Sequence, residues 1–263
     1  MIEVVQGPGW SEWHDSLMDK SSYAQTNLQL YAELRQAGYS LGETEDVHAA
    51  YELALSLFTG CYRGSGKPFL AHAVGTASIL ASLHARGAVV ATGLLHAAYT
   101  HGEFGNGWRG AAPEKRKRLR DTMGPEIEDL VARYTALRWN ARTIPGIHNR
   151  LDALGPMEQE VLLMRLANEL EDHLELGVLY CADAERRRDY IRSSLHLCVD
   201  MAQRLGFQQL AVALAEAFRE TLAAEVPTAF CRRESVSFVV APASHRLRLR
   251  VRLRYLHARL QGR

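Results

Sequence analysis

The chain lacks the cysteine pairs that would indicate a zinc ribbon or a redox dithiol. Its 263 residues include four cysteines, and none of them forms a C-x-x-C pair. Three of the four stand among apolar residues, which is typical of small core side chains carrying reduced thiols. The N-terminus also lacks a basic stretch followed by an apolar run, so we expect no signal peptide.

Long hydrophobic runs are missing as well. The most apolar segment, residues 88–98, is about half as long as a bilayer span requires, and it contains His96. No transmembrane segment is therefore expected, and the sequence predicts a soluble cytoplasmic protein. With 47% hydrophobic and 23% charged residues, the chain has the composition of a globular protein with a sizeable core.

An excess of charge of one sign is absent from the chain as a whole but present in its tail. The net charge is +1, yet residues 228–263 hold nine arginines, no lysine and one glutamate, so the tail carries +8 and the rest −7. Apolar/Arg alternation suits a strand, whereas four leucines between residues 249 and 260 share a helical face. We favour a helix because a lone strand would expose an unpaired edge. The tail predicts either an anionic partner, such as a membrane surface or RNA, or a homo-oligomer.

Strand signals are scarce, and apolar residues recur mainly at helical spacing, which predicts an all-α bundle. We expect an irregular N-terminal arm with a short helix in residues 1–42, a helical domain in 43–226 and the Arg-rich C-terminal tail in 227–263. Loops are expected over residues 102–113, where Phe104 and Trp108 should pack on the body, and over 142–155. Helices are expected over residues 43–58, 68–83, 89–99, 114–121, 124–137, 158–181, 186–205 and 208–224.

Two short segments contain the polar residues that could form a site. The segment RGSGKPFLAH spans residues 63–72, and LLHAAY spans residues 94–99. A histidine followed by an aspartate would chelate a metal ion. Here His96 is followed by Ala97, whose methyl group offers no ligand atom.

Residues 43–218, roughly two thirds of the chain, resemble the hydrolase domain of the RelA/SpoT family, the HD-superfamily enzymes that degrade the alarmone (p)ppGpp. The resemblance implies an HD-type helical bundle, a guanine contact for Arg63, and metal-binding positions at His72 and His96. It also implies that position 168 holds the last metal ligand. The segments that carry it, by their order and spacing, are residues 63–69, 72, 96, 124–131, 165–168, 204–206 and 216–218.

The departures from the family pattern fall on the chemical residues. The family's His-Asp pair becomes His-Ala at residues 96–97, its following Glu-Asp pair becomes Thr-His at 100–101, and its final aspartate becomes Asn168. Hard divalent cations favour carboxylate ligands, and only His72, His96 and the Asn168 amide would remain. We therefore expect no metal cofactor, and no (p)ppGpp hydrolysis by the family mechanism.

The residues that remain could still surround one polar pocket. Along the expected helix 158–181, Arg165, Asn168, Glu169 and Asp172 lie three or four residues apart and share a face. Pairs of histidine and carboxylate are suited to general acid–base catalysis. The predicted catalytic residues are His72, His96, His101, Glu103 and Glu169, and the predicted substrate-binding residues are Arg63, Lys67, Tyr99, Arg165, Asn168 and Asp172.

Two functions stay open from the sequence. The first is a divergent HD-superfamily enzyme, metal-independent or weakly metal-dependent, that acts on a small anionic or nucleotide-like substrate. The alternative is a catalytically inactive pseudoenzyme that serves as a ligand sensor or scaffold. An iron-dependent oxygenase of HD type is disfavoured because it needs several carboxylate ligands. Each candidate also has a purely structural interpretation, since buried histidines and loop arginines often satisfy only local contacts.

Overall fold

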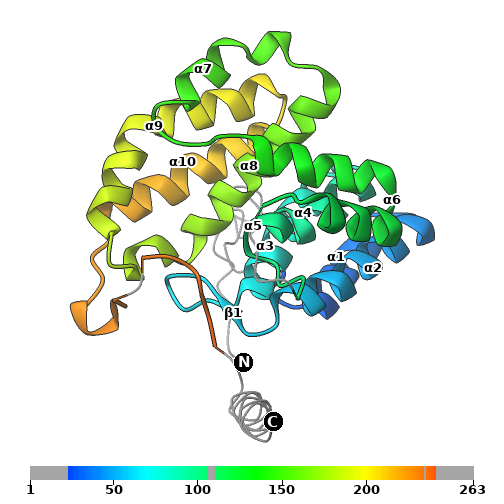
Figure 1. The fold of residues 1–263 in the computed structure, drawn as a ribbon. Coiled ribbons are helices and arrows are strands. Elements are labelled where there is room, and N and C mark those ends of the chain that lie inside the picture. The colour runs from blue at the N-terminus through cyan, green and yellow to red at the C-terminus, as the bar shows by residue number, and fades with distance from the viewer. Residues whose placement is uncertain (1–22, 106–109, 234, 241–263) are drawn as a thin grey trace, which may run out of the picture.

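The computed structural model describes residues 23–105, 110–233 and 235–240, and within them the predicted all-α bundle is confirmed (Figure 1). The expected arm over residues 1–22, Trp108, and the arginine-rich residues 241–263 with their expected helix lie outside the described residues. The helices are α1 (Asn27–Gln36), α2 (Leu41–Phe58), α3 (Phe69–Ser82), α4 (Gly87–Leu95), α5 (Ala98–His101), α6 (Pro113–Ala136), α7 (Ile144–Asn149), α8 (Pro156–Leu174), α9 (Ala184–Arg204) and α10 (Gln208–Ala223).

Local sequence signals set the starts of the first helices. Thr26 and Gln29 form a capping box at the start of α1, and Ser40 and Glu43 form another at the start of α2. In each box two backbone N–H groups that lack helical partners are satisfied by side chains. These two helices then pack against α3 and α4.

The centre of the fold is the contact of α3 with α4 and α8. Nearly every residue of α3 is buried, because α1, α4 and α8 cover it from different sides. Gly93 lets α4 approach closely, since a Cβ atom there would lie 2.8 Å from Cδ1 of Leu80. In Figure 1, α8 lies between the group α1–α6 and the helices α9 and α10. This arrangement brings the polar ends of α3, α4 and α8 together.

The helix predicted over residues 89–99 is interrupted, which corrects the sequence interpretation. Helix α4 ends at Leu95, and α5 begins at Ala98. Nδ1 of His96 donates to the carbonyl oxygen of Gly93 at 2.7 Å. In a continuing helix that carbonyl would instead accept from the backbone N–H of Ala97. The break turns the residues after His96 away from the α4 axis.

Two further predictions on local structure are wrong. Residues 142–155, expected as a loop, contain α7 and a 3₁₀ turn at Leu151–Ala153, since Pro145 occupies the first helical turn, where no N–H donor is needed. The helix expected over 158–181 ends at Leu174, because Leu176 adopts a left-handed conformation with φ 56°. A 3₁₀ turn, Gly177–Tyr180, follows it.

The described part of the tail forms a short β-pairing that the sequence did not reveal. Strand β1 (Cys61–Tyr62) pairs antiparallel with β2 (Phe238–Val239), and a 3₁₀ turn, Thr228–Phe230, precedes β2. The rings of Tyr62 and Phe238 stack with centroids 5.5 Å apart. Residues 235–240 therefore cross beside the segment that leads to α3.

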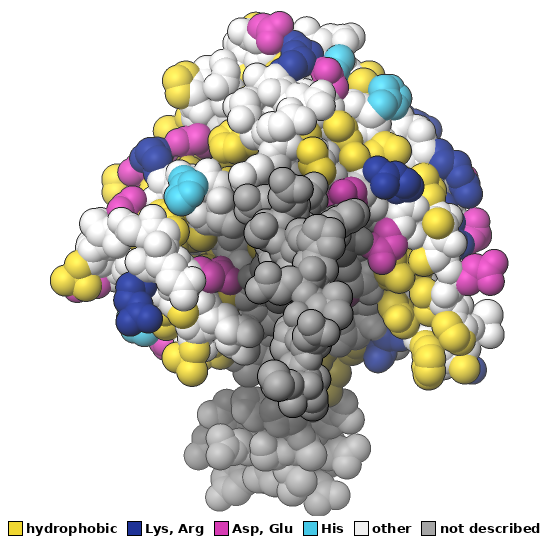
Figure 2. Space-filling model, turned by 180° about the vertical axis from the view of Figure 1, so that it is seen from behind, with side chains coloured by type: hydrophobic (Ala, Val, Ile, Leu, Met, Phe, Trp, Pro, Cys, Tyr) yellow, Lys and Arg dark blue, Asp and Glu magenta, His cyan; other side chains and the backbone are white. Residues whose placement is uncertain are grey.

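The charged surface and the cysteines fit the near-neutral net charge and the absence of cysteine pairs in the sequence. Acidic and basic side chains are interspersed on the face shown in Figure 2. The four cysteines are free thiols, three of them buried. In the part of the chain that the structure describes, no helix has both the length and the apolar character that a membrane span requires.

The kink in α6 gives a first prediction. Gly124 has φ 83° and ψ 168°, a conformation essentially restricted to glycine, and it separates the two helices expected over 114–137. Gly124→Ala should lower the free energy of unfolding by about 1–3 kcal/mol through backbone strain, because no atom lies within 4 Å of the added Cβ.

Urea denaturation measures this effect. Gly146→Ala is the matched control, since its Cβ also meets nothing within 4 Å and Gly146 lies inside α7 with ordinary φ. That variant should be neutral or stabilising by up to about 1 kcal/mol. Equal losses in both variants would contradict the strain argument.

Candidate functional site

The two histidines singled out from the sequence lie side by side in the interior. His72 projects from α3, and His96 follows the last residue of α4. Their ring centroids are 5.2 Å apart, and the two residues are 0% and 3% exposed. The ring of Tyr134, from α6, lies 5.1 Å from that of His96. Three helices thus converge on one polar centre.

Both ring nitrogens of His72 are engaged. Nε2 lies 3.1 Å from Nη1 of Arg63 and 3.2 Å from Nδ2 of Asn168, and both of these groups only donate. Nε2 must therefore accept, and Nδ1–H donates to the carboxylate of Glu171. Burial, and then the charge of Arg63, hold the pKa of His72 well below its ordinary value. His72 is a neutral ring with no lone pair free for another ligand.

The orientation of Asn168 follows from its other contacts. Its Oδ1 accepts from the hydroxyl of Tyr134 at 2.6 Å and from Nη1 of Arg165 at 2.9 Å. The amide nitrogen is therefore the atom that faces His72. A carboxylate at this position would have no N–H group to donate to Nε2 of His72. The amide of Asn168 donates there through its nitrogen and accepts from Tyr134 and Arg165 through its oxygen.

His96 differs from His72 because one of its nitrogens stays available. Nδ1–H donates to the carbonyl of Gly93, so Nε2 is the unprotonated nitrogen of the neutral ring. Burial first, and then the neighbouring His72, hold the pKa of His96 well below its ordinary value. The ring lines a cavity, where its lone pair makes it a candidate base.

A tight turn carries the two predicted cations into the site. The N–H of Arg63 donates to the carbonyl of Lys67 at 2.9 Å, and the N–H of Gly66 donates to the carbonyl of Arg63 at 2.8 Å. Gly66 has φ 92°, a conformation that glycine adopts without strain. Both side chains therefore leave the same turn toward α8.

Each cation pairs with a carboxylate of α8. Arg63 donates to Asp172, and Lys67 lies 2.5 Å from Oε1 of Glu171 and 3.1 Å from Oε2 of Glu175. Although burial opposes ionisation, Arg63 holds the pKa of Asp172 well below its usual range. Burial raises the pKa of Glu171 to about 8 in spite of the nearby Lys67.

A cavity of about 250 Å³ lies over His96, Ala97 and Asn168, and we call it the His96 cavity. Arg63, Arg165, His101 and the rings of Phe69, Tyr134 and Trp139 also line it, and among the described residues no carboxylate does. It is therefore a basic cavity with aromatic walls at the position where the resemblance places acidic ligands.

Two further cavities adjoin the His96 cavity. One of about 250 Å³, the Lys67 cavity, shares Arg63 and His101 with it and is also lined by Glu171 and Asp172. A larger one of about 550 Å³ between α8 and α9 shares Trp139 and Arg165 with the His96 cavity. The predicted residue Glu169 belongs to this larger space, where it pairs with Arg165 and accepts from Tyr190 at 3.2 Å.

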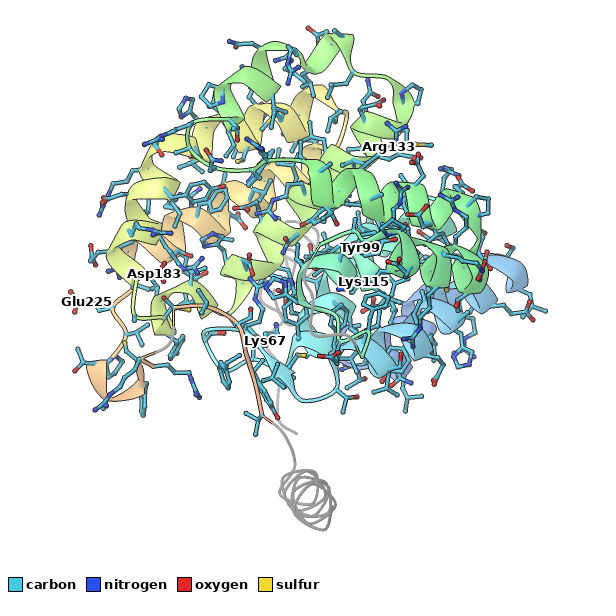
Figure 3. The ribbon with its side chains drawn as sticks, in the orientation of Figure 1. Lys67, Tyr99, Lys115, Arg133, Asp183 and Glu225 are labelled. Carbon is cyan, nitrogen blue, oxygen red and sulfur yellow. The ribbon has the colours of Figure 1, made fainter. Side chains whose placement is uncertain are left out.

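Two predicted site residues lie away from the histidine centre. Tyr99 is fully buried under α6, and its hydroxyl donates to Glu128 at 3.0 Å. Figure 3 shows Tyr99 apart from Lys67. Glu103 is exposed and accepts from the N–H of Gly105 at 2.5 Å. The break at Ala97 explains both positions, because it redirects the chain after His96.

The structure adds residues that the sequence reasoning missed. Glu171 follows Asn168 by three residues on the same face of α8, so helical spacing could have identified it. Tyr134 and Trp139 come from α6 and the segment after it, and no motif marks either of them.

The positions that the resemblance assigns to metal ligands do not fit a divalent cation. Ala97 has no donor atom, the amide of Asn168 turns its nitrogen toward His72, and Nε2 of His72 already accepts from Arg63. Only the lone pair of His96 is left, and one imidazole does not make a metal site.

The fold and the site define a helical bundle with a histidine-centred cavity, and comparisons with known proteins give its relatives. Residues 57–138 match a family described only as a domain of unknown function, DUF6817. The chain is 26% identical over 163 residues to guanosine-3′,5′-bis(diphosphate) 3′-pyrophosphohydrolase of Haemophilus influenzae, covering 60% of this chain and 22% of that protein. It is 28% identical over 179 residues to a GTP pyrophosphokinase of Brucella suis, covering 66% and 22%. The chain is thus a distant relative of RelA/SpoT-type proteins and matches less than a quarter of their length.

The low pKa of His96 predicts how stability depends on pH. An unfolded histidine titrates near pH 6.5, so below about that pH the unfolded chain binds a proton that the folded ring does not. Each such histidine lowers the free energy of unfolding by about 1.4 kcal/mol per pH unit as the pH falls. Above about pH 6.5 its contribution to stability is complete.

Urea denaturation between about pH 6 and pH 5 tests this dependence. His96→Gln keeps a donor for the carbonyl of Gly93 and should remove about 1.4 kcal/mol per pH unit of the slope. The exposed His196 on α9 is the matched control, and His196→Gln should keep the wild-type slope. An unchanged slope in the His96 variant would show that His96 is not a buried neutral ring.

Proposed function

We propose that the His96 cavity binds a small anionic, nucleotide-like ligand, and that the protein acts on this ligand by metal-independent acid–base chemistry. The observation that carries the proposal is the lining, which contains Arg63 and Arg165 and, within the part of the chain that the structure describes, no carboxylate. An anion placed there meets two guanidinium groups in a partly desolvated space, where charges interact more strongly than in water.

The two arginines keep donors for such a ligand. A guanidinium has five N–H donors, and a carboxylate partner takes at most two of them. Asp172 and Glu169, the partners of Arg63 and Arg165, do not line the His96 cavity. Arg63 also donates to His72, and Arg165 also donates to Tyr134 and Asn168. Part of each guanidinium, including the buried Nε of Arg165 that has no hydrogen-bond partner among the described residues, is left for a ligand.

The size and the walls of the space favour a ligand with a planar group. The His96 cavity of about 250 Å³ is small for a whole nucleotide, but the adjoining cavity adds about 550 Å³. Trp139 lines both spaces, and an aromatic ring there suits stacking on a base. The Haemophilus influenzae relative is named for acting on a guanosine bis(diphosphate), which supports a ligand of this kind.

His96 is the base in this proposal. Its tautomer is set by Gly93, and its unprotonated Nε2 takes a proton from a water or a hydroxyl group. Arg63 and Arg165 stabilise the negative charge that grows on the ligand as the proton leaves. His72 does not share this task because both of its nitrogens are engaged. His101, which lines the same cavity, is the second candidate for proton transfer.

Restoring an acidic residue tests the binding part of the proposal. Ala97→Asp places a carboxylate in the cavity and should weaken binding of pyrophosphate and GTP by about tenfold or more, since like charges repel there. Isothermal titration calorimetry on the full chain measures the affinity. Ala136→Asp, on the exposed last turn of α6, is the matched control and should bind as the wild type does. Tighter anion binding by the Ala97 variant would refute the proposal.

A ligand sensor is the second candidate, favoured by the internal pairing of most charged groups in the site. Arg63, Lys67, Glu171 and Asp172 all contact one another or His72, which leaves His96 as the main free base. A sensor would bind the same ligand and leave it unchanged.

Turnover separates the two functions. With guanosine-3′,5′-bis(diphosphate) or GTP, an enzyme should release product without added Mn²⁺, and His96→Gln should slow it about 100-fold or more while binding persists. Product is measured by chromatography, and His196→Gln serves as control. Binding without turnover in the wild type would favour the sensor, and turnover only with Mn²⁺ would refute metal independence.

A further inference from the structure

A second set of metal-ligand atoms shares His72 with the positions that the resemblance implies. His72, Glu171 and Asp172 each offer one ligand atom, and these three atoms lie within 4.8 Å of one another. His72 and Glu171 are 0% and 3% exposed. One imidazole and two carboxylates form a donor set that zinc and manganese sites use.

Two cations of the chain already occupy this set. Nη1 of Arg63 lies 3.1 Å from Nε2 of His72, and its other terminal nitrogen donates to Asp172. Nζ of Lys67 lies 2.5 Å from Oε1 of Glu171. Together they bring two positive charges to two carboxylates, the charge that one divalent ion would bring.

The turn is held in place by packing as well as by charge. A Cβ atom on Gly64 would lie 3.2 Å from Sγ of Cys181 and 3.1 Å from the backbone carbon of Ser235. The turn therefore fits closely between the 3₁₀ segment after α8 and the strand that returns from the tail. The backbone that carries the two cations therefore cannot shift toward these neighbours without displacing them.

From these contacts we propose that the turn of residues 63–67 is a built-in counter-ion that closes a latent divalent-cation site made by His72, Glu171 and Asp172. Arg63 is its central group, because it bridges the imidazole and a carboxylate and lines both small cavities. The charge balance of the site then comes from the chain itself. Removal of this guanidinium uncovers a site for Zn²⁺ or Mn²⁺. The proposal goes beyond ligand binding in the His96 cavity and does not depend on which anion binds there.

Metal titration of Arg63 variants tests the proposal. The full chain is freed of metal with a chelator and titrated with Zn²⁺ or Mn²⁺ alone in a calorimeter. Arg63→Ala should bind one ion about tenfold or more tightly than the wild type, because a repelling charge is gone and the carboxylate of Asp172 is released. Arg63→Lys keeps a cation and should behave as the wild type. The double variant Arg63→Ala, Asp172→Asn should lose the gain.

Two further measurements keep the result decisive. Circular dichroism reports whether Arg63→Ala folds, and Arg63→Gln, which removes the charge but keeps an amide donor, serves if it does not. Visible absorption of bound Co²⁺ reports nitrogen and oxygen ligands directly. Tight binding of one ion by the wild type, or folded Arg63→Ala and Arg63→Gln proteins that bind no more metal than the wild type, would overturn the proposal. Neither outcome bears on the anion binding that Ala97→Asp tests, because that variant keeps Arg63.

Discussion

The site depends on the contact between Arg63, His72 and Asp172, which joins the turn before α3, the first turn of α3 and the end of α8. Buried charges are costly unless each has a partner, and here every ionised group in the contact has one. The arginine accounts for the low pKa of Asp172 and contributes to that of His72. Its removal would leave the partly buried carboxylate of Asp172 without its cation, and it would take away one of the two donors that Nε2 of His72 accepts from. The three elements therefore hold one another in place.

The same contact explains why two adjacent histidines have different chemistry. His72 is surrounded by donors and one carboxylate, which use both nitrogens, whereas His96 gives one nitrogen to its own helix and keeps the other. Residue type alone does not separate them, since both are buried and neutral. The number of hydrogen-bond partners around each ring separates the two histidines. Under the proposed function, His96 is the base beside two guanidinium groups, and Arg63 and Lys67 balance the carboxylates of Asp172 and Glu171.

Much of the fold could be predicted from the sequence, because helical periodicity, glycine and proline positions are local signals. The shared face of α8 was also predictable, and it places Asn168 and Asp172 beside His72 as expected. The break at Ala97 was not, since it depends on a side-chain hydrogen bond that competes with the helix. Because of that break, Tyr99 lies under α6 and not at the predicted position in the site. The engagement of His72 was hidden too, because Glu171 meets it only through the packing of α3 on α8.

The pairing of β1 with β2 joins the described part of the tail to the helical region. Residues 235–237 form part of the wall of the Lys67 cavity, and Ser235 accepts from Arg187 and touches the turn at Gly64. The helical region 43–226, which looks self-sufficient by its pattern, therefore lacks part of the wall of the Lys67 cavity. A fragment cut at that boundary would keep the helices but lose residues 235–237, and the Lys67 cavity would open further to solvent on that side.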